Sequence, residues 1–245
     1  LVARPRLVRK NVKRDALVVG QINRRRCGAD VNRRQPAGVA MSENIDTFAG
    51  LLAPRGQSFE SIHAAGAGNV AGAAARLGIR QLVLISAIGA DSESESRYAQ
   101  TKAEGEARVR AAFPAAVILR PSIVFGPEDQ FFNKFAALAR LVPALPLIGG
   151  GQTRFQPVFV GDVAAAIVAA LENPDAAGKT YELGGPTVYT FKELIERVLR
   201  ETGRTRALIP LPFALASIKA FFLQFAPNPL LTPDQRRLFD ALSDQ

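Results

Sequence analysis

Residues 81 to 121 contain the pattern that most restricts the fold of this chain. Gln81 to Ser86 is an almost uninterrupted apolar run, typical of a strand buried on both faces of a parallel sheet. A helical stretch from about Ser96 to Ala112 follows, ends before Pro114, and leads into a second apolar run at Val117 to Leu119. Strand, helix and strand joined by short links form a βαβ unit, in which the two strands are parallel and the helix covers the sheet. The sequence therefore predicts an α/β protein whose ligands gather at the carboxyl ends of its strands.

Further elements are predicted on both sides of this unit. Small and apolar residues at helical spacing predict a helix from Ser58 to Leu77, which Gly78 terminates. Thr190, with Glu193 three residues later, has the pattern of a capping box at the start of a helix. The remaining predictions are helices at 131–141, 161–171, 190–201 and 213–226, extended segments at 155–160 and 180–183, and a glycine turn at 149–151.

Composition and charge exclude several classes of function. One cysteine, Cys27, excludes an internal disulfide framework, and a single histidine, His63, argues against a histidine-based metal cage. Residues 1 to 60 hold 12 basic and 5 acidic residues, a net of +7 out of the total of +9, and have no aromatic residue before Phe48. A basic run without aromatic side chains lacks a surface for stacking bases, so no nucleic-acid partner is expected. No apolar run of about 18 residues predicts a membrane span, and the apolar helix at 213–226 is too short for one.

Three residues near this βαβ unit have the chemistry of proton transfer. Tyr98 and Lys102 lie four residues apart on the predicted helix, so both side chains project from one face. A tyrosine, whose unperturbed pKa is about 10, needs help to exchange a proton near neutral pH, and an adjacent ammonium group favours the phenolate. Ser86 ends the first strand, where its hydroxyl could orient a substrate oxygen. Tyrosine and lysine at this spacing also occur by chance in many helices. The strand context and the flanking motifs are what favour a catalytic pair over a chance one.

Those flanking motifs resemble a known family. Ser86, YAQTK at 98–102, LRPSIVFGP at 119–127, FQPVFVGDVA at 155–164 and YELGGP at 181–186 resemble the extended and atypical short-chain dehydrogenase/reductases, the NAD-dependent epimerase/dehydratase group. More narrowly, RPSIVFGPEDQFFNKF at 120–135 and PLIGGG at 146–151 resemble the branch that includes the nucleotide-binding accessory subunit of respiratory complex I and its bacterial relatives. The resemblance covers about residues 47 to 240.

The resemblance implies a fold and a division into domains. It implies a Rossmann-like, doubly wound parallel sheet that lacks its first strand, with a smaller C-terminal lobe. We expect the NAD(P)-binding region at 1–125, of which 1–46 match the family least, and the lobe at 126–245, with 155–172 returning to the Rossmann-like core. The family's glycine-rich turn, which lays a pyrophosphate on a helix N-terminus, has no counterpart in the sequence. This chain is therefore expected to bind the cofactor weakly or not at all.

The resemblance also assigns roles residue by residue. It implies that Tyr98 and Lys102 lie beside the nicotinamide ribose, that Lys102 holds the ribose hydroxyls, and that Ser86 faces the reacting carbon. Arg4 occupies the place after the family's second strand, where a guanidinium would pair with the 2′-phosphate of NADP; this slightly favours NADP over NAD, although Arg4 could equally be a solvated charge. The other implied contacts are Pro121, Ser122 and Val124 at the nicotinamide end and Gly50 under the adenosine ribose and phosphates. Phe131, Asn133 and Arg154 are candidates for the substrate cleft, although core packing explains Phe131 equally well.

Two hypotheses about function follow. In the first, the chain binds NAD(P) and carries out reductase-type or epimerase-type chemistry through Ser86, Tyr98 and Lys102. In the second, it is a non-catalytic, cofactor-binding accessory or assembly subunit of respiratory complex I, or a factor that supports quinone metabolism. The second hypothesis gives the apolar helix at 213–226 a respiratory-complex or membrane-surface partner. A cytoplasmic location is expected, with a peripheral position on the inner (cytoplasmic) membrane as the alternative. His63 is expected to be a packed or solvated residue rather than a catalyst.

Overall fold

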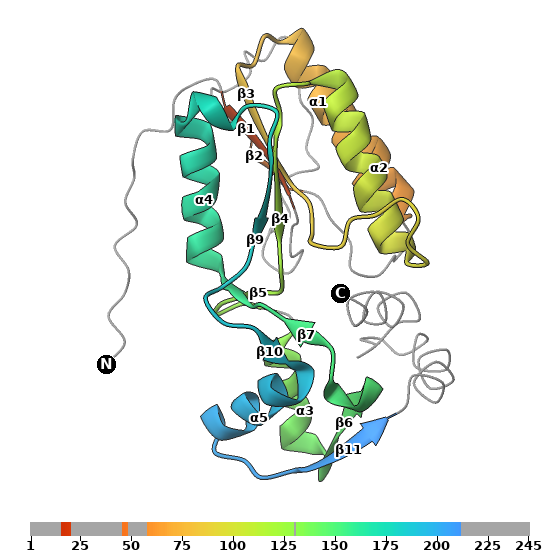
Figure 1. The fold of residues 1–245 in the computed structure, drawn as a ribbon, viewed down its shortest axis with the longest axis vertical. Coiled ribbons are helices and arrows are strands. Elements are labelled where there is room, and N and C mark those ends of the chain that lie inside the picture. The colour runs from red at the N-terminus through yellow and green to blue at the C-terminus, as the bar shows by residue number, and fades with distance from the viewer. Residues whose placement is uncertain (1–15, 21–45, 49–57, 130, 212–245) are drawn as a thin grey trace, which may run out of the picture.

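The computed structural model describes residues 16–20, 46–48, 58–129 and 131–211. In these residues, a parallel sheet of five strands is the centre of the larger of two parts, and a smaller lobe follows it. The strands lie in the order β2-β1-β3-β4-β9, and all four neighbouring pairs are parallel (Figure 1). Their bounds are β1 Ala16–Gly20, β2 Asp46–Phe48, β3 Gln81–Ile85, β4 Val117–Pro121 and β9 Thr180–Leu183. The predicted strands at 81–86, 117–119 and 180–183 are confirmed.

The sheet differs from the prediction on the side of β3 that is away from β4. The sequence predicts that the first strand is missing there, but the structure has two strands, β1 and β2. β1 pairs with β3 over Ala16 to Val19, and β2 pairs with the other edge of β1. β1 was not predicted because its five residues, ALVVG, stand between strongly basic stretches and are too few to show a period. Residues 21–45, which follow β1, lie outside the described residues, so the lack of a pyrophosphate turn and the weak cofactor binding stay predictions.

Helices cover both faces of the sheet, as a doubly wound fold requires (Figure 1). A π-helical segment η1, Glu60–Gly66, continues into α1, Ala67–Arg76; α1 and α2, Arg97–Ala112, pack on one face. α4, Val160–Glu172, packs on the other face. Alternate residues of β3 therefore point to opposite apolar cores: Leu82 and Leu84 contact the first helix pair, and Val83 lies with Leu171 of α4. Burial on both faces is the reason why β3 is apolar throughout.

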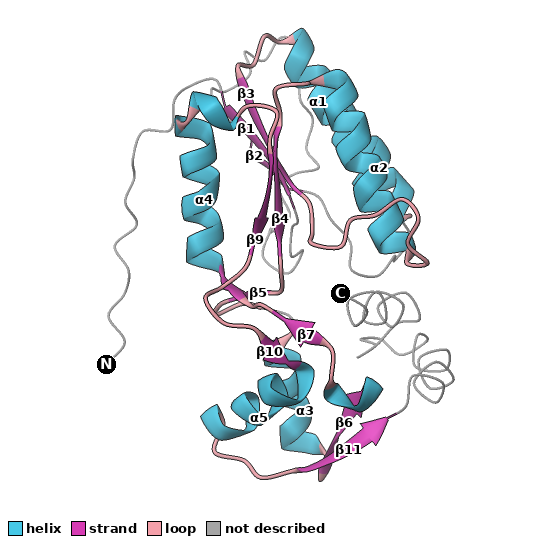
Figure 2. Cartoon of the chain, in the orientation of Figure 1, coloured by secondary structure: helices cyan, strands magenta, loops and turns pink. Residues whose placement is uncertain are grey.

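The C-terminal lobe is a separate apolar core with its own elements, shown by type in Figure 2. Helices α3, Phe132–Leu141, and α5, Phe191–Glu201, pack together beside strands β6, Ala144–Ile148, and β11, Ala207–Leu211, which pair in parallel. Two further short pairs are β5 Val124–Phe125 with β8 Val158–Phe159, and β7 Arg154–Phe155 with β10 Tyr189–Thr190. The buried members of this core are Phe135, Ala139, Leu145, Leu147, Ile148, Phe155, Phe191, Leu194, Ile195, Val198 and Leu199.

Two local predictions in the lobe are confirmed in detail. The Thr190 hydroxyl accepts a hydrogen bond from the backbone N–H of Glu193, and the Glu193 carboxylate accepts one from the backbone N–H of Thr190, so the capping box is complete. Gly149 to Gly151 form a 3₁₀ turn, η2, with φ values of 58°, 70° and 80°, which side-chain-bearing residues rarely adopt. The 3₁₀ turn η3, Pro174–Ala176, leads from α4 toward β9.

The predicted helix at 213–226 lies outside the described residues. Among the helices that the structure describes, none is both long enough and apolar enough to cross a membrane. The division at residue 125 stays a prediction, although the packing of α4 on β3 and β4 agrees with the expected return of 155–172 to the sheet.

Candidate functional site

Ser86 lies directly after β3, at the carboxyl end of the parallel sheet. Its backbone N–H donates a hydrogen bond to the Leu119 carbonyl oxygen at 2.7 Å, so the ladder between β3 and β4 continues for one residue and fixes the position of Ser86. The side chain is only 4% exposed, and its hydroxyl oxygen has no hydrogen-bond partner among the described residues. A buried hydroxyl that makes no hydrogen bond costs free energy, and such a group is expected where a ligand completes the site.

Tyr98 and Lys102 lie on the face of α2 that is turned toward the same end of the sheet. The helix begins after Ser96, whose side chain accepts a hydrogen bond from the backbone N–H of Ala99. Tyr98 and Lys102 are both buried, with 9% and 6% of their surface exposed. The Lys102 Nζ lies 5.8 Å from the centre of the Tyr98 ring and makes a long hydrogen bond of 3.5 Å to the carbonyl oxygen of Ile85. Lys102 therefore connects the tyrosine on the helix to the strand end next to Ser86.

Burial changes the acid–base behaviour of Lys102. Removal of the ammonium group from water lowers the pKa of Lys102 from 10.5 to about 8, and the negative charge of Glu106 partly opposes this effect. At neutral pH the side chain is still largely protonated, but it loses its proton far more readily than an exposed lysine. Lys102 can thus supply a positive charge to the site near neutral pH.

His63 and its neighbours support Tyr98 from the side of η1. The His63 ring stacks on Phe59 with centroids 5.3 Å apart and meets the Tyr98 ring edge to face, also at 5.3 Å. Its Nδ1 lies within hydrogen-bond distance, 3.2 Å, of the Thr101 hydroxyl. His63 is 4% exposed, so it is packed, one of the two states expected from the sequence, while its lack of a catalytic role stays a prediction. These contacts restrict the position of the Tyr98 ring.

The backbones of η1 and α2 touch at Gly105. A Cβ atom at this position would collide with the carbonyl oxygen of His63, so only glycine allows the two helices to approach this closely. The close approach brings His63 against the first turns of α2, where Tyr98 and Thr101 lie.

A buried ion-pair network, which the sequence analysis missed, lies one turn beyond Lys102. Glu106 is 2% exposed, and its two carboxylate oxygens accept hydrogen bonds of 2.9 and 2.8 Å from Arg120 on β4. Arg120 also pairs with Glu182 on β9 at 3.7 Å, and Arg110 lies 3.9 Å from Glu106. The signal in the sequence is the spacing: Glu106 follows Lys102 by four residues and so shares its face of α2.

The predicted cofactor contacts that can be located lie at the end of β4. The Pro121 carbonyl oxygen accepts a hydrogen bond from the Ile88 N–H at 3.1 Å, and the Ser122 N–H donates one to Leu183 at 2.9 Å. Val124 pairs with Val158 in the β5–β8 ribbon. The structure thus brings Ser86 and Pro121 to the carboxyl ends of neighbouring strands, while their contact with a cofactor stays a prediction. Two further predicted contacts, Arg4 and Gly50, lie outside the described residues.

The three residues predicted for the substrate cleft are not gathered in one place. Phe131 packs its ring against Phe135, Phe155 and Phe191, with centroids 5.2, 6.2 and 6.0 Å away, as in the alternative of core packing. Asn133 is exposed, and its side-chain amide donates hydrogen bonds to the carbonyl oxygens of Pro127 and Asp129, which holds the loop before α3. Arg154 is exposed on β7. A role of these residues in substrate binding stays a prediction.

An exposed aromatic pair, also missed from the sequence, lies on the ribbon that follows β4. Phe125 and Phe159 are register partners in the β5–β8 pair and are 38% and 43% exposed, with ring centroids 5.7 Å apart. Strand alternation is hard to recognise in segments of two residues, which is why sequence reasoning did not find this pair.

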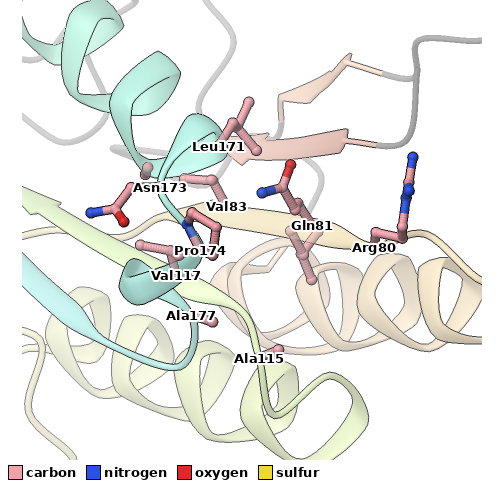
Figure 3. A pocket seen from close by; sticks show the side chains of 11 residues that line it. Arg80, Gln81, Val83, Ala115, Val117, Leu171, Asn173, Pro174 and Ala177 are labelled. Carbon is pink, nitrogen blue, oxygen red and sulfur yellow. The ribbon is translucent and has the colours of Figure 1, made fainter. Parts of the chain in front are cut away.

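A cavity of about 340 Å³ lies at the opposite end of the sheet (Figure 3). Its lining includes Gln81 and Val117 at the amino ends of β3 and β4, Leu171 near the end of α4, and Pro174 at the start of η3. Ligands of open α/β sheets bind at the carboxyl ends of the strands, so we place the candidate site at Ser86 and not in this cavity. Within the described parts of the chain, no group of three or more histidine, cysteine, aspartate or glutamate side chains could hold a metal ion.

Two known proteins are similar to this chain in sequence. A subunit of mitochondrial NADH dehydrogenase (ubiquinone) from Arabidopsis thaliana, 1 alpha subcomplex subunit 9, is 44% identical over 161 residues, which are 64% of this chain and 40% of that protein. A ceramide reductase from Caulobacter vibrioides is 33% identical over 165 residues, 67% of this chain and 51% of that protein. The chain thus spans about half, or less, of the length of these relatives.

A solved structure supports the fold, and a family model gives the family. The crystal structure of a double mutant of DesIV, a dTDP-glucose 4,6-dehydratase from Streptomyces venezuelae with NAD bound, matches 62% of this chain and 54% of that chain with a TM-score of 0.55 and 21% identity. At that identity the likeness establishes the fold. The model of the NAD dependent epimerase/dehydratase family matches residues 52–184, more than half of the chain. This chain therefore belongs to the NAD dependent epimerase/dehydratase family.

Proposed function

We propose that this chain is the core of an NAD(P)-dependent reductase or epimerase-like enzyme in which Ser86, Tyr98 and Lys102 manage the substrate proton. The observation that carries the proposal is the position of Lys102, whose buried ammonium group reaches the Ile85 carbonyl oxygen at 3.5 Å. The next residue along the chain is Ser86, whose buried hydroxyl has no hydrogen-bond partner among the described residues. A buried charge and an unsatisfied buried hydroxyl both cost free energy. A polar ligand at the end of β3 would remove both costs.

The nicotinamide end of a dinucleotide fits this part of the site. Lys102 would hold the ribose hydroxyls, since it has donors beyond its long bond to Ile85, and Pro121, Ser122 and Val124 would lie along the ring. The bound nicotinamide would supply or accept a hydride. Related solved structures hold NAD or NADP, and preference for NADP rests on Arg4 alone.

The three side chains divide the proton chemistry between them. The Ser86 hydroxyl would donate a hydrogen bond to the substrate oxygen and orient it. The Tyr98 hydroxyl would give a proton to that oxygen or take one from it, and the ammonium group of Lys102 would favour the charged phenolate. The ring contacts with His63 and Phe59 hold Tyr98 in place for this exchange. The similarity to a ceramide reductase supports reductase-type chemistry.

The test separates binding from turnover. Saturation-transfer NMR with reduced nicotinamide mononucleotide, NADH and NADPH measures binding, and the mononucleotide needs only the nicotinamide end of the site. We expect Lys102→Met to lose binding of the mononucleotide, and Lys192→Met, which removes an exposed lysine on α5, to keep it. We expect Tyr98→Phe to keep binding and to lose at least a hundredfold in the rate of NAD(P)H oxidation with a panel of aldehydes and ketones. Wild-type turnover in Tyr98→Phe would contradict the catalytic assignment.

A second candidate function is favoured by one observation, the 44% identity to a plant NADH dehydrogenase (ubiquinone) subunit. In this alternative the chain binds the cofactor without turnover and serves as an accessory or assembly subunit of a respiratory complex, or supports quinone metabolism, at the cytoplasmic face of the inner membrane. The test is co-migration of the tagged chain with NADH:quinone oxidoreductase activity on native gels of detergent-solubilised membranes. Migration apart from that activity, together with turnover that depends on Tyr98, would exclude this alternative.

A further inference from the structure

Glu106 is a buried charge to which the proposed function gives no direct role. It lies on α2 one helical turn after Lys102, and it is only 2% exposed. Among the buried polar and charged residues in the described part of the chain, only Ser96, Thr101 and Thr153 are less exposed. Buried carboxylates are costly unless they are paired, and Glu106 is paired on both oxygens. The question is what such an arrangement contributes at this place.

Arg120 fixes the Glu106 carboxylate in a single position. Two parallel hydrogen bonds of 2.9 and 2.8 Å join the guanidinium group to the two carboxylate oxygens, a bidentate geometry that allows little movement. Arg120 is the residue of β4 just before Pro121, and it also pairs with Glu182 on β9. The network therefore fastens the middle of α2 to the carboxyl ends of two strands, in the region where Lys102 reaches the end of β3.

The groups around Lys102 come from each element that packs against it. From α2 there are the Glu106 carboxylate and the Tyr98 ring; from β3 there is the Ile85 carbonyl oxygen; from β4 there is Arg120, held through Glu106. On η1 the titratable group is His63, which contacts Tyr98 and Thr101. Glu106 is thus the anion that favours the charged form of the buried lysine. Arg120, as a second cation bound to Glu106, would repel the ammonium group of Lys102.

We propose that Glu106 is a positioning residue that keeps Lys102 charged and directed at the end of β3, and that Arg120 holds Glu106 in place while limiting its effect. The consequence of this arrangement for catalysis rests on the proposed function. The effect of Glu106 on the charge of Lys102 does not, since that effect is present without substrate. Burial lowers the pKa of Lys102 to about 8, and the charge of Glu106 opposes this effect. Without that charge the pKa of Lys102 would fall further, so that part of the lysine would be deprotonated at neutral pH.

The experiment measures the titration of Lys102 itself. The full chain is labelled with carbon-13 and nitrogen-15 at lysine, and the side-chain shifts of its seven lysines are followed by NMR from pH 6 to 11. The Lys102 signal is identified by its absence in Lys102→Arg. We expect Glu106→Gln to lower the titration midpoint of Lys102 by about one pH unit, and Arg120→Gln to raise it. The matched control is Glu104→Gln. Glu104 lies two residues after Lys102, and its exposed carboxylate is paired with Arg108. We expect this variant to leave the titration midpoint of Lys102 unchanged.

Opposite shifts distinguish this role from a purely structural one. If Glu106 only held the fold together, Glu106→Gln and Arg120→Gln would both loosen α2 and move the midpoint in the same direction, toward that of an exposed lysine; that result, or an unchanged midpoint in Glu106→Gln, overturns the proposal. If Glu106→Gln does not fold, Glu106→Asp decides, since it withdraws the charge by one methylene and predicts a smaller downward shift. The midpoint requires no turnover, so a failed activity assay leaves this test intact. In an active enzyme, the same variants shift the alkaline limb of the pH profile of kcat in parallel, since activity is lost there as Lys102 loses its proton.

Discussion

Helices α2 and α5 bury one face each, but they bury different chemistry. The buried side chains of α5 are all apolar: Phe191, Leu194, Ile195, Val198 and Leu199. The buried face of α2 includes Thr101, Lys102 and Glu106 as well as apolar residues. Apolar burial explains α5 fully, since each large side chain contributes about 1.5–3 kcal/mol when it is removed from water. Packing does not explain α2, because apolar side chains in place of its buried charges would be equally or more stabilising.

The difference separates a region shaped by stability from a region shaped by function. In the lobe, sequence pattern and packing agree at every level, from the capping box to the aromatic core. Around α2 they conflict, because a lysine, a glutamate and a serine are buried where apolar residues would fold more readily. Conflicts of this kind are expected at functional sites. Substitutions in the two helices should therefore have opposite consequences, which the following predictions test.

The largest effect is expected in α5. Leu194→Ala removes a fully buried side chain from the middle of the lobe core and should lower the free energy of unfolding by about 3–4 kcal/mol, because transfer and cavity costs add. Chemical denaturation followed by circular dichroism measures the change. Glu196→Ala, at an exposed position on the same helix, is the control and should cost less than about 0.5 kcal/mol. A loss below about 1 kcal/mol in Leu194→Ala would mean that the lobe core contributes little to stability.

A smaller effect of the opposite sign is expected at Lys102 in α2. The pKa of Lys102 is about 8 in the folded chain and 10.5 when the side chain is in water, so between these values the unfolded chain binds more protons than the folded chain. Stability contributed by Lys102 therefore rises with pH through this window, by about 2 kcal/mol between pH 7.5 and pH 10. Below pH 8 the buried charge carries its full cost.

Lys102→Met tests this linkage. The variant lacks the titrating group, so it should be more stable than the wild type at pH 7.5 and should lose most of that advantage at pH 10. Urea denaturation of both proteins at the two pH values measures the difference, and subtracting the two curves removes the titration of all other groups. A constant difference between the proteins at both pH values would show that Lys102 is not buried as a charge.

The sequence predicts the bounds of both helices and the apolar face of α5, but not the ion pair that α2 buries. The apolar period of α5, its Thr190 cap and the apolar runs of β3 and β4 are local signals, and the predicted elements agree with the structure within about two residues. Motif order and strand context predict the serine, tyrosine and lysine, and their part in catalysis stays a prediction. Glu106 and Arg120 were missed because the pair joins a helix to a strand, and the two residues, 14 positions apart, share no local pattern that fixes this contact.

Two other features have similar physical causes. The sequence leaves both the substrate cleft and core packing open for Phe131, and its ring lies among Phe135, Phe155 and Phe191, two of which are distant in sequence. Strand β1 was not predicted because its neighbours in the sheet, β2 and β3, are supplied by residues 26 and more positions further along the chain. In both cases tertiary contacts decide what local propensity leaves open.

The smallest effect is expected at the cap of α5. Thr190→Ala removes the hydroxyl that accepts the Glu193 N–H at 3.2 Å and should cost about 1 kcal/mol in the free energy of unfolding, while Thr190→Ser should keep most of the stability. The same denaturation experiment measures both. Because the cap belongs to the lobe, Thr190→Ala should leave the titration midpoint of Lys102 unchanged. A shifted midpoint would show that the lobe and the face of α2 are coupled, and the contrast between the two helices would then describe one cooperative unit with two kinds of burial.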